Sequence, residues 1–268
     1  MLYDFGFIGC GNMGGALARA AVRSLPGEKI ILSSRTAEKA EALASSLGVR
    51  AGTNEDAASE SRYIFLGVKP QIMESVLKPL QAILRTRESR FILVTMAAGI
   101  PIERIRELAG GAYPTIRIMP NTPAAIGAGM IQFCASADVT AEDKEFFLSH
   151  MSGAGLFDEL EESRIDAASA VSGCGPAFVS LFIEALSDGG VACGLPRAKA
   201  LQYAAQMVKG SAELVLKSGK HPGQLKDEVC SPGGSTIEGI KALEDAAFRA
   251  AVINAVAAAY RKNTELGK

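Results

Sequence analysis

Histidine is scarce in this sequence, and its cysteines are scattered. The 268-residue chain has two histidines, His150 and His221, and five cysteines, which occur at positions 10, 134, 174, 193 and 230. No Cys-x-x-Cys pair and no cluster of His and Cys occurs, and zinc sites are built from such clusters. We therefore expect no bound metal, and we expect free thiols in a reducing cytoplasm.

Long runs of basic residues and long runs of apolar residues are also missing. The chain has 28 basic and 29 acidic residues, a net charge of −1 and no run of Lys and Arg, so a nucleic-acid partner is not expected. No run of about 18 apolar residues free of charge occurs, so no membrane-spanning segment is expected. The first residues lack a basic stretch followed by an apolar one, so we expect no secretory signal peptide. These absences favour a cytoplasmic protein.

Short apolar runs alternate with amphipathic stretches in the first 160 residues. Such alternation, at intervals of about 30 residues, is typical of an α/β Rossmann-type doubly wound sheet. We expect strands over 2–8, 29–33, 62–68, 91–95 and 115–119. We expect helices over 13–24, 37–47, 72–84 and 102–109. Gly48 is the expected C-cap of the second helix, because glycine accepts the left-handed conformation at that position.

The pattern changes near residue 160, after which the sequence shows no convincing strand. Alanine-rich helical patterns cover 164–192, 197–218 and 236–265. We therefore expect a Rossmann-type domain over 1–160 and an all-helical domain over 161–268. The stretch 167–186 is almost without charge, and a helix that is apolar all round must be buried all round. A domain this small has little interior, so we expect a homodimer formed through these helices.

A glycine-rich motif, Gly9-x-Gly11-x-x-Gly14, follows the first expected strand and opens a helix. In this context it predicts a dinucleotide site. The first glycine permits a tight turn, the second leaves room for a diphosphate, and the third lets the helix approach the strand. Amides at the helix N-terminus would hold the phosphates. We expect the cofactor to contact Gly9, Cys10, Gly11, Asn12 and Met13.

The end of the second expected strand indicates which dinucleotide is bound. NAD sites place an acid there, whereas this chain has Ser33-Ser34-Arg35-Thr36 and no acid before Glu38. A guanidinium suits a 2′-phosphate, so Ser34 and Arg35 predict NADPH, with NADH as the alternative. Loops after later strands should also line the cofactor. These loops add Asn54 near the adenine, then Val68, Lys69, Pro70, Ala97 and Ala98.

A second candidate anion site lies at DEVCSPGGSTIEG, residues 227–239. A Pro-Gly-Gly turn runs directly into a helix, and its exposed amides would form a nest for a carboxylate. We expect Ser231, Gly233, Gly234, Ser235 and Thr236 to bind a substrate carboxylate, with the Thr236 hydroxyl beside it. Ser235 and Glu238 also fit a capping box, so a well-capped helix without ligand is the other interpretation.

Hydride transfer between two such sites needs a proton donor or base when the substrate is a ketone or an alcohol. β-Hydroxyacid dehydrogenases place a lysine four residues after a helical glycine motif, and this chain has Val179 there. A protonated imine accepts hydride without such a group. The residues therefore favour reduction of a C=N bond in a carboxylate-bearing small molecule.

Taken together, five segments resemble pyrroline-5-carboxylate reductase. They are GFIGCGNMG, VKPQ, RIMPNTPA, SGCGPAF and DEVCSPGGSTIEG, spread over residues 6–239 in the expected order. The resemblance implies NAD(P)H-dependent reduction of 1-pyrroline-5-carboxylate to L-proline, the last step of proline biosynthesis. It also implies interleaved dimers, commonly assembled into decamers.

The resemblance further implies residue roles. The threonine matching Thr236 hydrogen-bonds the substrate ring nitrogen, and the loop matching Ser231–Thr236 holds its carboxylate. The stretch containing Asn121 lies beside the nicotinamide. Cys174 and Cys230 stand where serine is common, a near-isosteric change that we take as neutral. Two alternatives remain: another NADP-dependent hydroxyacid or imine oxidoreductase, and a non-enzymatic NADP-binding regulator.

Overall fold

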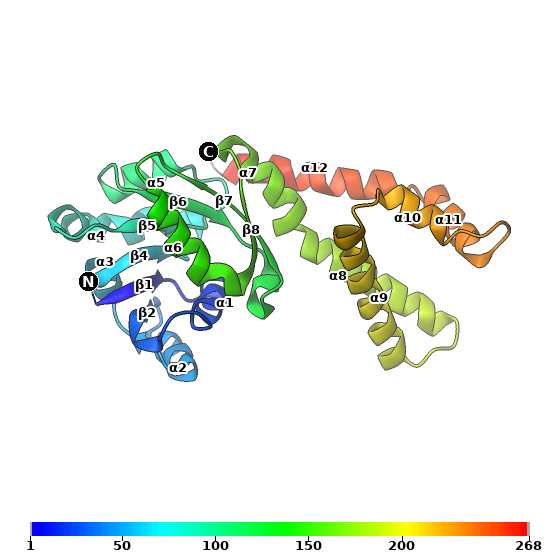
Figure 1. Cartoon of the computed structure of the whole chain (residues 1–268), viewed down its shortest axis with the longest axis horizontal. Coiled ribbons are helices and arrows are strands. Elements are labelled where there is room, and N and C mark those ends of the chain that lie inside the picture. The colour runs from blue at the N-terminus through cyan, green and yellow to red at the C-terminus, as the bar shows by residue number, and fades with distance from the viewer. Residues whose placement is uncertain (1, 267–268) are drawn as a thin grey trace. The chain divides into compact units, whose positions relative to one another are not determined.

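The computed structural model describes residues 2–266, and its first part is built on one eight-stranded sheet (Figure 1). The strand order is β3-β2-β1-β4-β5-β6-β7-β8, and all neighbours are parallel except β6 and β7. The strands are β1 (Tyr3–Ile8), β2 (Ile30–Ser33), β3 (Arg50–Ala51), β4 (Ser61–Leu66), β5 (Ile92–Thr95), β6 (Thr115–Met119), β7 (Gly129–Ala135) and β8 (Gly155–Glu159). The expected Rossmann-type sheet is confirmed, with β3, β7 and β8 added to it.

Helices cover both faces of this sheet. They are α1 (Asn12–Ala21), α2 (Ala37–Leu47), α3 (Asn54–Glu60), α4 (Met73–Thr86), α5 (Ile102–Ala109), α6 (Ala141–Met151) and α7 (Glu162–Ala168). Short 3-10 turns occur at Gly27–Lys29, Pro70–Ile72, Thr122–Ile126 and Ser152–Ala154. Gly48 closes α2 with φ +66°, as expected for a glycine C-cap.

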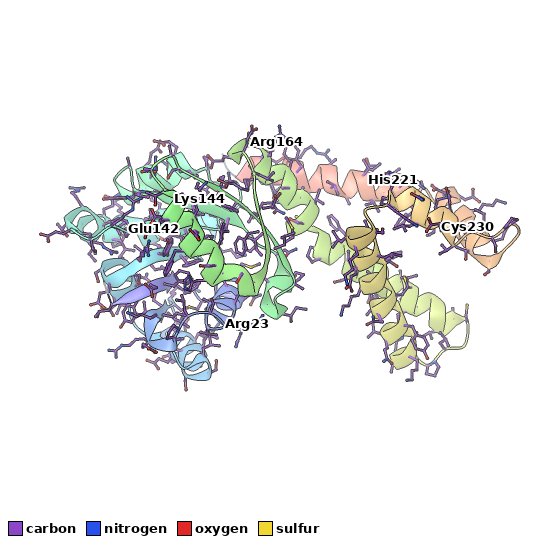
Figure 2. All side chains as sticks on the ribbon, in the orientation of Figure 1. Arg23, Glu142, Lys144, Arg164, His221 and Cys230 are labelled. Atoms are coloured by element: carbon purple, nitrogen blue, oxygen red, sulfur yellow. The ribbon has the colours of Figure 1, made fainter. Side chains whose placement is uncertain are left out.

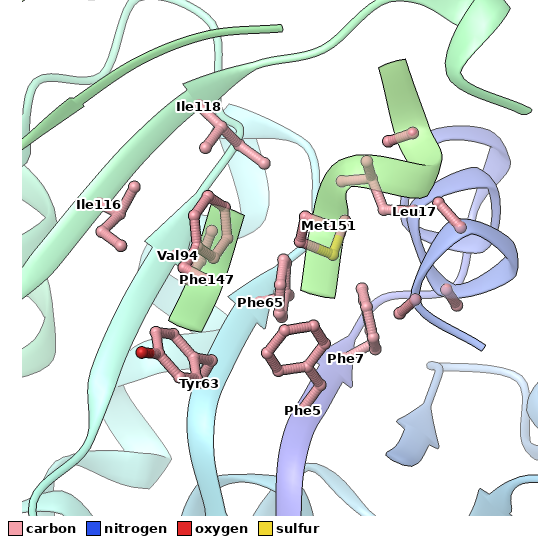
Figure 3. Packing of buried hydrophobic residues seen from close by; sticks show 14 of the residues in the cluster. Phe5, Phe7, Leu17, Tyr63, Phe65, Val94, Ile116, Ile118, Phe147 and Met151 are labelled. Carbon is pink, nitrogen blue, oxygen red and sulfur yellow. The ribbon is translucent and has the colours of Figure 1, made fainter. Parts of the chain in front are cut away.

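Alternating side chains of the central strands build two separate cores. Phe5, Phe7, Tyr63 and Phe65 gather on the face covered by α1 and α6, where Phe147 packs against them (Figure 3). The intervening strand residues point to the opposite face and pack under α3, α4 and α5. Because successive residues of a strand face opposite sides, one apolar run supplies both cores. This explains why the central strands read as continuous apolar stretches.

The remaining chain is helical. Its elements are α8 (Gly175–Ala192), α9 (Arg197–Ser218), α10 (Pro222–Glu228), α11 (Ser235–Asp245) and α12 (Phe248–Leu266). The chain forms two compact units. The first comprises the residues up to Cys174 together with those from Ala259 onwards, and the second comprises Gly175–Ala258. The observed boundary after Cys174 is later than the predicted one near 160, because α7 and the turn after it belong to the unit that contains the sheet.

Two long predicted helices are interrupted. A π-helical turn, Ser169–Gly173, separates α7 from α8, and α11 ends before Ala247, which has φ +56°. Conversely, the helical segment Glu162–Ala192 is long and apolar enough, by length and composition, to cross a membrane. The sequence expectation rested on the lack of an apolar run free of charge, and this segment contains charged residues, so it did not stand out in the sequence. That nothing spans a membrane stays a prediction.

Candidate functional site

The expected cofactor residues lie at the carboxyl end of the sheet, around β1. This strand has β2 on one side and β4 on the other, so the loops after β1 and β4 diverge at the point where the strand order reverses. Open α/β sheets bind ligands at such a switch point. The Gly9 N–H donates to the Ser33 carbonyl at 2.9 Å, and the Gly67 N–H donates to the Ile8 carbonyl at 2.8 Å. These bonds tie three strand ends together.

The three glycines of the motif have the local geometry predicted for them. Gly9 has φ +98°, which only glycine adopts without strain. A Cβ at Gly14 would lie 2.1 Å from the Gly9 carbonyl oxygen, whereas a Cβ at Gly11 would meet no atom within 4 Å. No side chain caps α1, whose N-cap is Gly11. The helix therefore starts with free amides beside open space, which is what a diphosphate requires.

Cys10 lies inside this glycine turn and fastens it to β2. Its thiol donates to the Ser33 carbonyl at 3.2 Å. Burial raises the pKa of the Cys10 thiol to about 11, so the sulfur carries no charge at neutral pH. An uncharged thiol adds no repulsion to a diphosphate bound at the neighbouring amides.

Ser34 and Asn54 line a pocket of about 380 Å³, and Arg35 follows Ser34 in the chain. The pocket is lined by Ser34, Ala37, Ala40, Glu41, Ala51, Gly52, Thr53, Asn54 and Glu55. The Ser33 hydroxyl donates to the Asn54 side chain, which holds the start of α3 against the end of β2. Arg35 is exposed and makes no ion pair within residues 2–266. Its guanidinium is thus available to an anion that enters beside this pocket.

The other two expected loops follow β4 and β5. Val68 lies against Gly9, because a Cβ built on Gly9 would be 2.8 Å from the Val68 Cγ1. Lys69 is exposed just beyond it. Ala97 is buried and its N–H donates to the Thr95 hydroxyl at 3.3 Å, while Ala98 packs beside a small apolar cluster that includes Ile102. Both loops end at the same edge of the sheet as the glycine motif.

Sequence reasoning missed a buried charged cluster centred on Arg117, which is 2% exposed. Its guanidinium Nη1 lies 3.3 Å from Glu162 Oε1, and its Nη2 lies 2.7 Å from Asp166 Oδ1. Glu162 Oε1 also accepts from the Ile102 N–H at 2.7 Å. The cluster therefore connects the start of α5, strand β6 and α7. Arginine within a strand of apolar residues, RIM, was the only signal available in the sequence.

Asn121 lies directly after β6 and is 7% exposed. Its Nδ2 donates to the Ser172 carbonyl at 2.9 Å, and its Oδ1 accepts from the Met130 N–H at 3.0 Å. Both ends of the side-chain amide are therefore bonded within the protein. Its role in cofactor binding stays a prediction, for which the side chain keeps a second Nδ2 hydrogen and a second Oδ1 lone pair.

The second expected anion site is a glycine turn that leads into α11 in the helical unit. Helix α11 begins at Ser235 with Gly234 as its N-cap and no side-chain cap, so the predicted Ser235/Glu238 capping box is wrong. The turn is closed instead by Gly234, whose N–H donates to the Ser231 carbonyl at 3.0 Å. Gly233 has φ +66°. Ser231, Gly233, Ser235 and Thr236 are exposed, and Gly234 is half-buried.

Neither histidine lies in the expected cofactor or substrate segments. His150 packs on Phe146, with ring centroids 4.1 Å apart. His221 Nδ1 accepts from the Gly223 N–H and caps α10, at the position labelled in Figure 2. Within residues 2–266 there is also no group of three or more His, Cys, Asp or Glu residues arranged to hold a metal ion. Both histidines thus have structural roles.

Comparisons with known proteins cover both units. Residues 162–266 match a family model described as pyrroline-5-carboxylate reductase dimerisation. Residues 4–99 match one described as NADP oxidoreductase, coenzyme F420-dependent. Pyrroline-5-carboxylate reductase from Escherichia coli (strain K12) is 42% identical over 267 residues, which is 98% of each chain. The enzyme of the same name from Glycine max is also 42% identical, over 98% of this chain and 96% of its own.

A solved structure is similar over the same extent. The crystal structure of Plasmodium falciparum pyrroline carboxylate reductase with NADP bound has a TM-score of 0.89 to this chain at 34% identity. The match covers 99% of this chain and 98% of that one. The likeness therefore extends over the sheet and the helical unit.

Proposed function

The chain belongs to the pyrroline-5-carboxylate reductase family, and we propose that it reduces 1-pyrroline-5-carboxylate to L-proline with NADPH, the last step of proline biosynthesis. The observation that carries the proposal is the pair of uncapped helix N-termini at α1 and α11. The first suits a diphosphate and the second a small carboxylate. An enzyme that brings a dinucleotide and a small organic acid together needs both.

The cofactor fits the residues at the carboxyl edge of the sheet. The open space at Gly11 admits a diphosphate, which the amides of Cys10, Asn12 and Met13 would bind beside Gly9. Ser34 and Arg35 would hold the 2′-phosphate, and Asn54 would lie towards the adenine. The remaining length would be lined by Val68, Lys69, Pro70, Ala97, Ala98 and Asn121. When bound, NADPH supplies the hydride that reduces the C=N bond.

The substrate carboxylate would lie on the nest formed by Ser231, Gly233, Gly234, Ser235 and Thr236. Amides at the start of α11 offer hydrogen bonds and the positive end of the helix dipole. The Thr236 hydroxyl would bond the ring nitrogen and so orient the imine. Because a protonated imine is already electrophilic, orientation is the main task left to the protein. The structural roles of His150 and His221 agree with a site that has no histidine acid.

The enzyme associates with itself and acts on a small molecule. A second copy is the partner that the apolar segment Glu162–Ala192 would meet, because the match to the dimerisation family model begins at residue 162. Assembly of dimers into decamers, a cytoplasmic location, and the expected absence of nucleic-acid and membrane partners stay predictions.

A direct test mixes the protein with NADPH and 1-pyrroline-5-carboxylate and follows the loss of absorbance at the nicotinamide band. We expect turnover, with L-proline as the product. A 2-hydroxyacid or 3-hydroxyacid offered with NADP⁺ is the comparison substrate. Turnover of the hydroxyacid alone would favour a dehydrogenase, and tight NADPH binding without any turnover would favour a regulator.

The substrate assignment is tested by Thr236→Ala with Thr236→Ser as the matched control. Loss of one hydroxyl that orients the imine should lower kcat about tenfold, because each 1.4 kcal/mol of barrier changes a rate tenfold. NADPH affinity should not change, and serine should restore most of the rate. Equal damage to turnover and to NADPH binding by the alanine variant would contradict the assigned role.

The cofactor preference is tested by Arg35→Ala, with Lys39→Ala as the control, since Lys39 is also exposed and lies in the helix that follows. Loss of paired, charge-assisted bonds to a 2′-phosphate should weaken NADPH binding about tenfold and leave NADH binding unchanged. An unaltered ratio of the two affinities would exclude Arg35 as the phosphate ligand.

A further inference from the structure

The π-helical turn Ser169–Gly173 lies where the chain leaves the first compact unit. The Cys174 N–H donates to the Ser169 carbonyl at 3.0 Å, five residues back, and α8 with the second unit begins at Gly175. Single π-turns inside longer helices are rare and occur frequently at functional sites. The turn is therefore the last part of the first unit before α8 begins.

Proline at position 176 explains why an ordinary helix does not continue here. In an α-helix the Ser172 carbonyl would accept from the N–H of residue 176. Pro176 has no N–H, and a proline ring clashes with the carbonyl four residues before it. A wider turn relieves the clash, but the Ser172 carbonyl still lacks its α-helical donor.

The side chain of Asn121 supplies a donor to that carbonyl from a segment 51 residues away in the sequence. Its Nδ2 lies 2.9 Å from the Ser172 carbonyl oxygen, while its Oδ1 is held by the Met130 N–H at 3.0 Å. A second hydrogen bond holds the same turn: the Ser172 hydroxyl donates to Gln132 Oε1 at 2.8 Å. Asn121 and Gln132 are both more than nine-tenths buried. The end of β6 and the strand β7 thus hold the π-turn from one side.

We propose that Asn121 is a positioning residue that replaces the N–H missing at Pro176 and so holds the π-turn that precedes α8. The proposal rests on the proposed function only for its kinetic consequence. Because α8 starts the unit that contains the substrate nest, a loosened π-turn should impair turnover. The dinucleotide contacts around Gly9 do not involve this turn, so NADPH affinity should be spared.

Asn121→Asp is the sharpest variant, because it keeps the size of the side chain and an acceptor for the Met130 N–H but removes the donor to Ser172. We expect kcat to fall at least tenfold while the NADPH dissociation constant stays within about twofold of the parent value. Asn263→Asp is the matched control. Asn263 is equally buried and donates to the Asp166 carbonyl of α7 at 3.2 Å, so its loss should lower Tm but leave kcat within about twofold.

Two kinetic outcomes would overturn the proposal. A kcat within about twofold of the parent in Asn121→Asp would show that the contact positions nothing. A dissociation constant for NADPH that rises in step with the loss of kcat would make Asn121 a cofactor ligand instead.

A thermal double-mutant cycle with Pro176→Ala tests the contact between Asn121 and the Ser172 carbonyl even if the parent protein shows no pyrroline-5-carboxylate reduction. The Pro176→Ala substitution restores a main-chain N–H for the Ser172 carbonyl. Asn121→Asp should therefore lower Tm less than half as much in the Pro176→Ala background as in the parent. Equal losses would overturn the proposal. If Asn121→Asp alone does not fold, the double variant should fold. A double variant that stays unfolded while Pro176→Ala folds would contradict the proposal that the Asn121 side chain replaces the missing N–H.

Discussion

The two compact units bury their apolar side chains in opposite ways. In the first unit Phe5, Phe7 and Phe65 are fully buried within the chain itself. In the second, Gly175–Ala258, the buried apolar side chains among described residues are Ala200 and Ala204 alone, while Leu181 and Ile253 are each 67% exposed. One unit has a complete core, and the other has the surface of a core that a second copy must cover. The proposed cofactor site therefore lies in a unit that is stable through its own core. The proposed substrate nest lies in a unit whose apolar helices need a second copy to cover them.

The largest expected effect comes from placing charge on the exposed apolar helices. Leu181→Glu combined with Ile253→Glu should prevent dimerisation, because burying unpaired charges costs several kcal/mol each. Turnover should fall at least a hundredfold, since the nest on α11 loses the cover that holds its helices. Sedimentation velocity reports the mass, and the NADPH assay reports the rate. NADPH binding should persist, because the first unit keeps its own core.

Leu156→Glu is the control for that experiment. Leu156 lies on the edge strand β8 of the first unit and is 65% exposed, so the added charge is similar in exposure but lies outside the helical unit. Its mass and rate should match those of the parent. A monomer produced by Leu156→Glu, or a dimer that survives the double substitution, would contradict the claim that the helical unit forms the dimer and the first unit does not.

The next largest effect separates fold from ligand within the glycine motif. Gly11→Ala adds a Cβ that meets no protein atom within 4 Å, so Tm should be unchanged, yet the methyl enters the space proposed for the diphosphate. NADPH affinity should fall more than tenfold. Gly14→Ala places a Cβ 2.1 Å from the Gly9 carbonyl oxygen, so it should lower both Tm and affinity. Titration by NADPH fluorescence and a thermal melt distinguish the two variants. Unchanged NADPH binding by Gly11→Ala would mean that the diphosphate lies elsewhere.

The smallest expected effect concerns a polar network inside the first unit. The Asp143 carboxylate accepts from the N–H of Thr140, the N-cap of α6, and from Arg62 at 3.2 Å and Arg90 at 2.8 Å. Burial opposes the charged form, but hydrogen bonds from Arg90, Thr140 and Arg62 outweigh it and lower the pKa of the Asp143 carboxyl. Asp143→Asn should cost about 1.5 kcal/mol of unfolding free energy at neutral pH, the lower end of what hydrogen bonds to a charged group contribute, because asparagine keeps one acceptor oxygen.

The pH dependence of that loss has a defined sign. A carboxyl whose folded pKa is depressed stabilises the protein above its unfolded pKa, which is about 3.9 for aspartate, and the contribution disappears as the pH falls through the folded value. The difference between parent and Asp143→Asn in urea unfolding should therefore be constant from about pH 7 to about pH 5 and shrink below about pH 4. A difference that grows on acidification would contradict the assigned ion pairs.

The sequence predicted those parts of the fold whose signals are local. The bounds of α2, α5 and α9 agree with the predicted ranges, because each has a clear apolar periodicity and a glycine or proline at its end. Strand β8 was missed because it lies at the edge of the sheet and is mostly exposed. The break at Ala247 has neither glycine nor proline to announce it. Strand β3 and helix α3 are too short for a periodic pattern.

The candidate sites divide along the same line. Glycine spacing predicted the cradle at α1, because the residues that build it are adjacent in the chain. Arg117 with Glu162, and Asn121 with Ser172, are contacts between segments 45 and 51 residues apart, so no local pattern announces them. The capping-box prediction failed because Ser235 fits the motif by spacing while the glycine turn before it takes the N-cap position.

The most direct test of the account follows mass, NADPH binding and turnover together as the parent protein is diluted through its dimer dissociation. The account predicts that the affinity for NADPH stays constant while the specific activity falls in proportion to the remaining dimer. A monomer that turns over at the rate of the dimer would contradict the claim that the helical unit depends on a second copy.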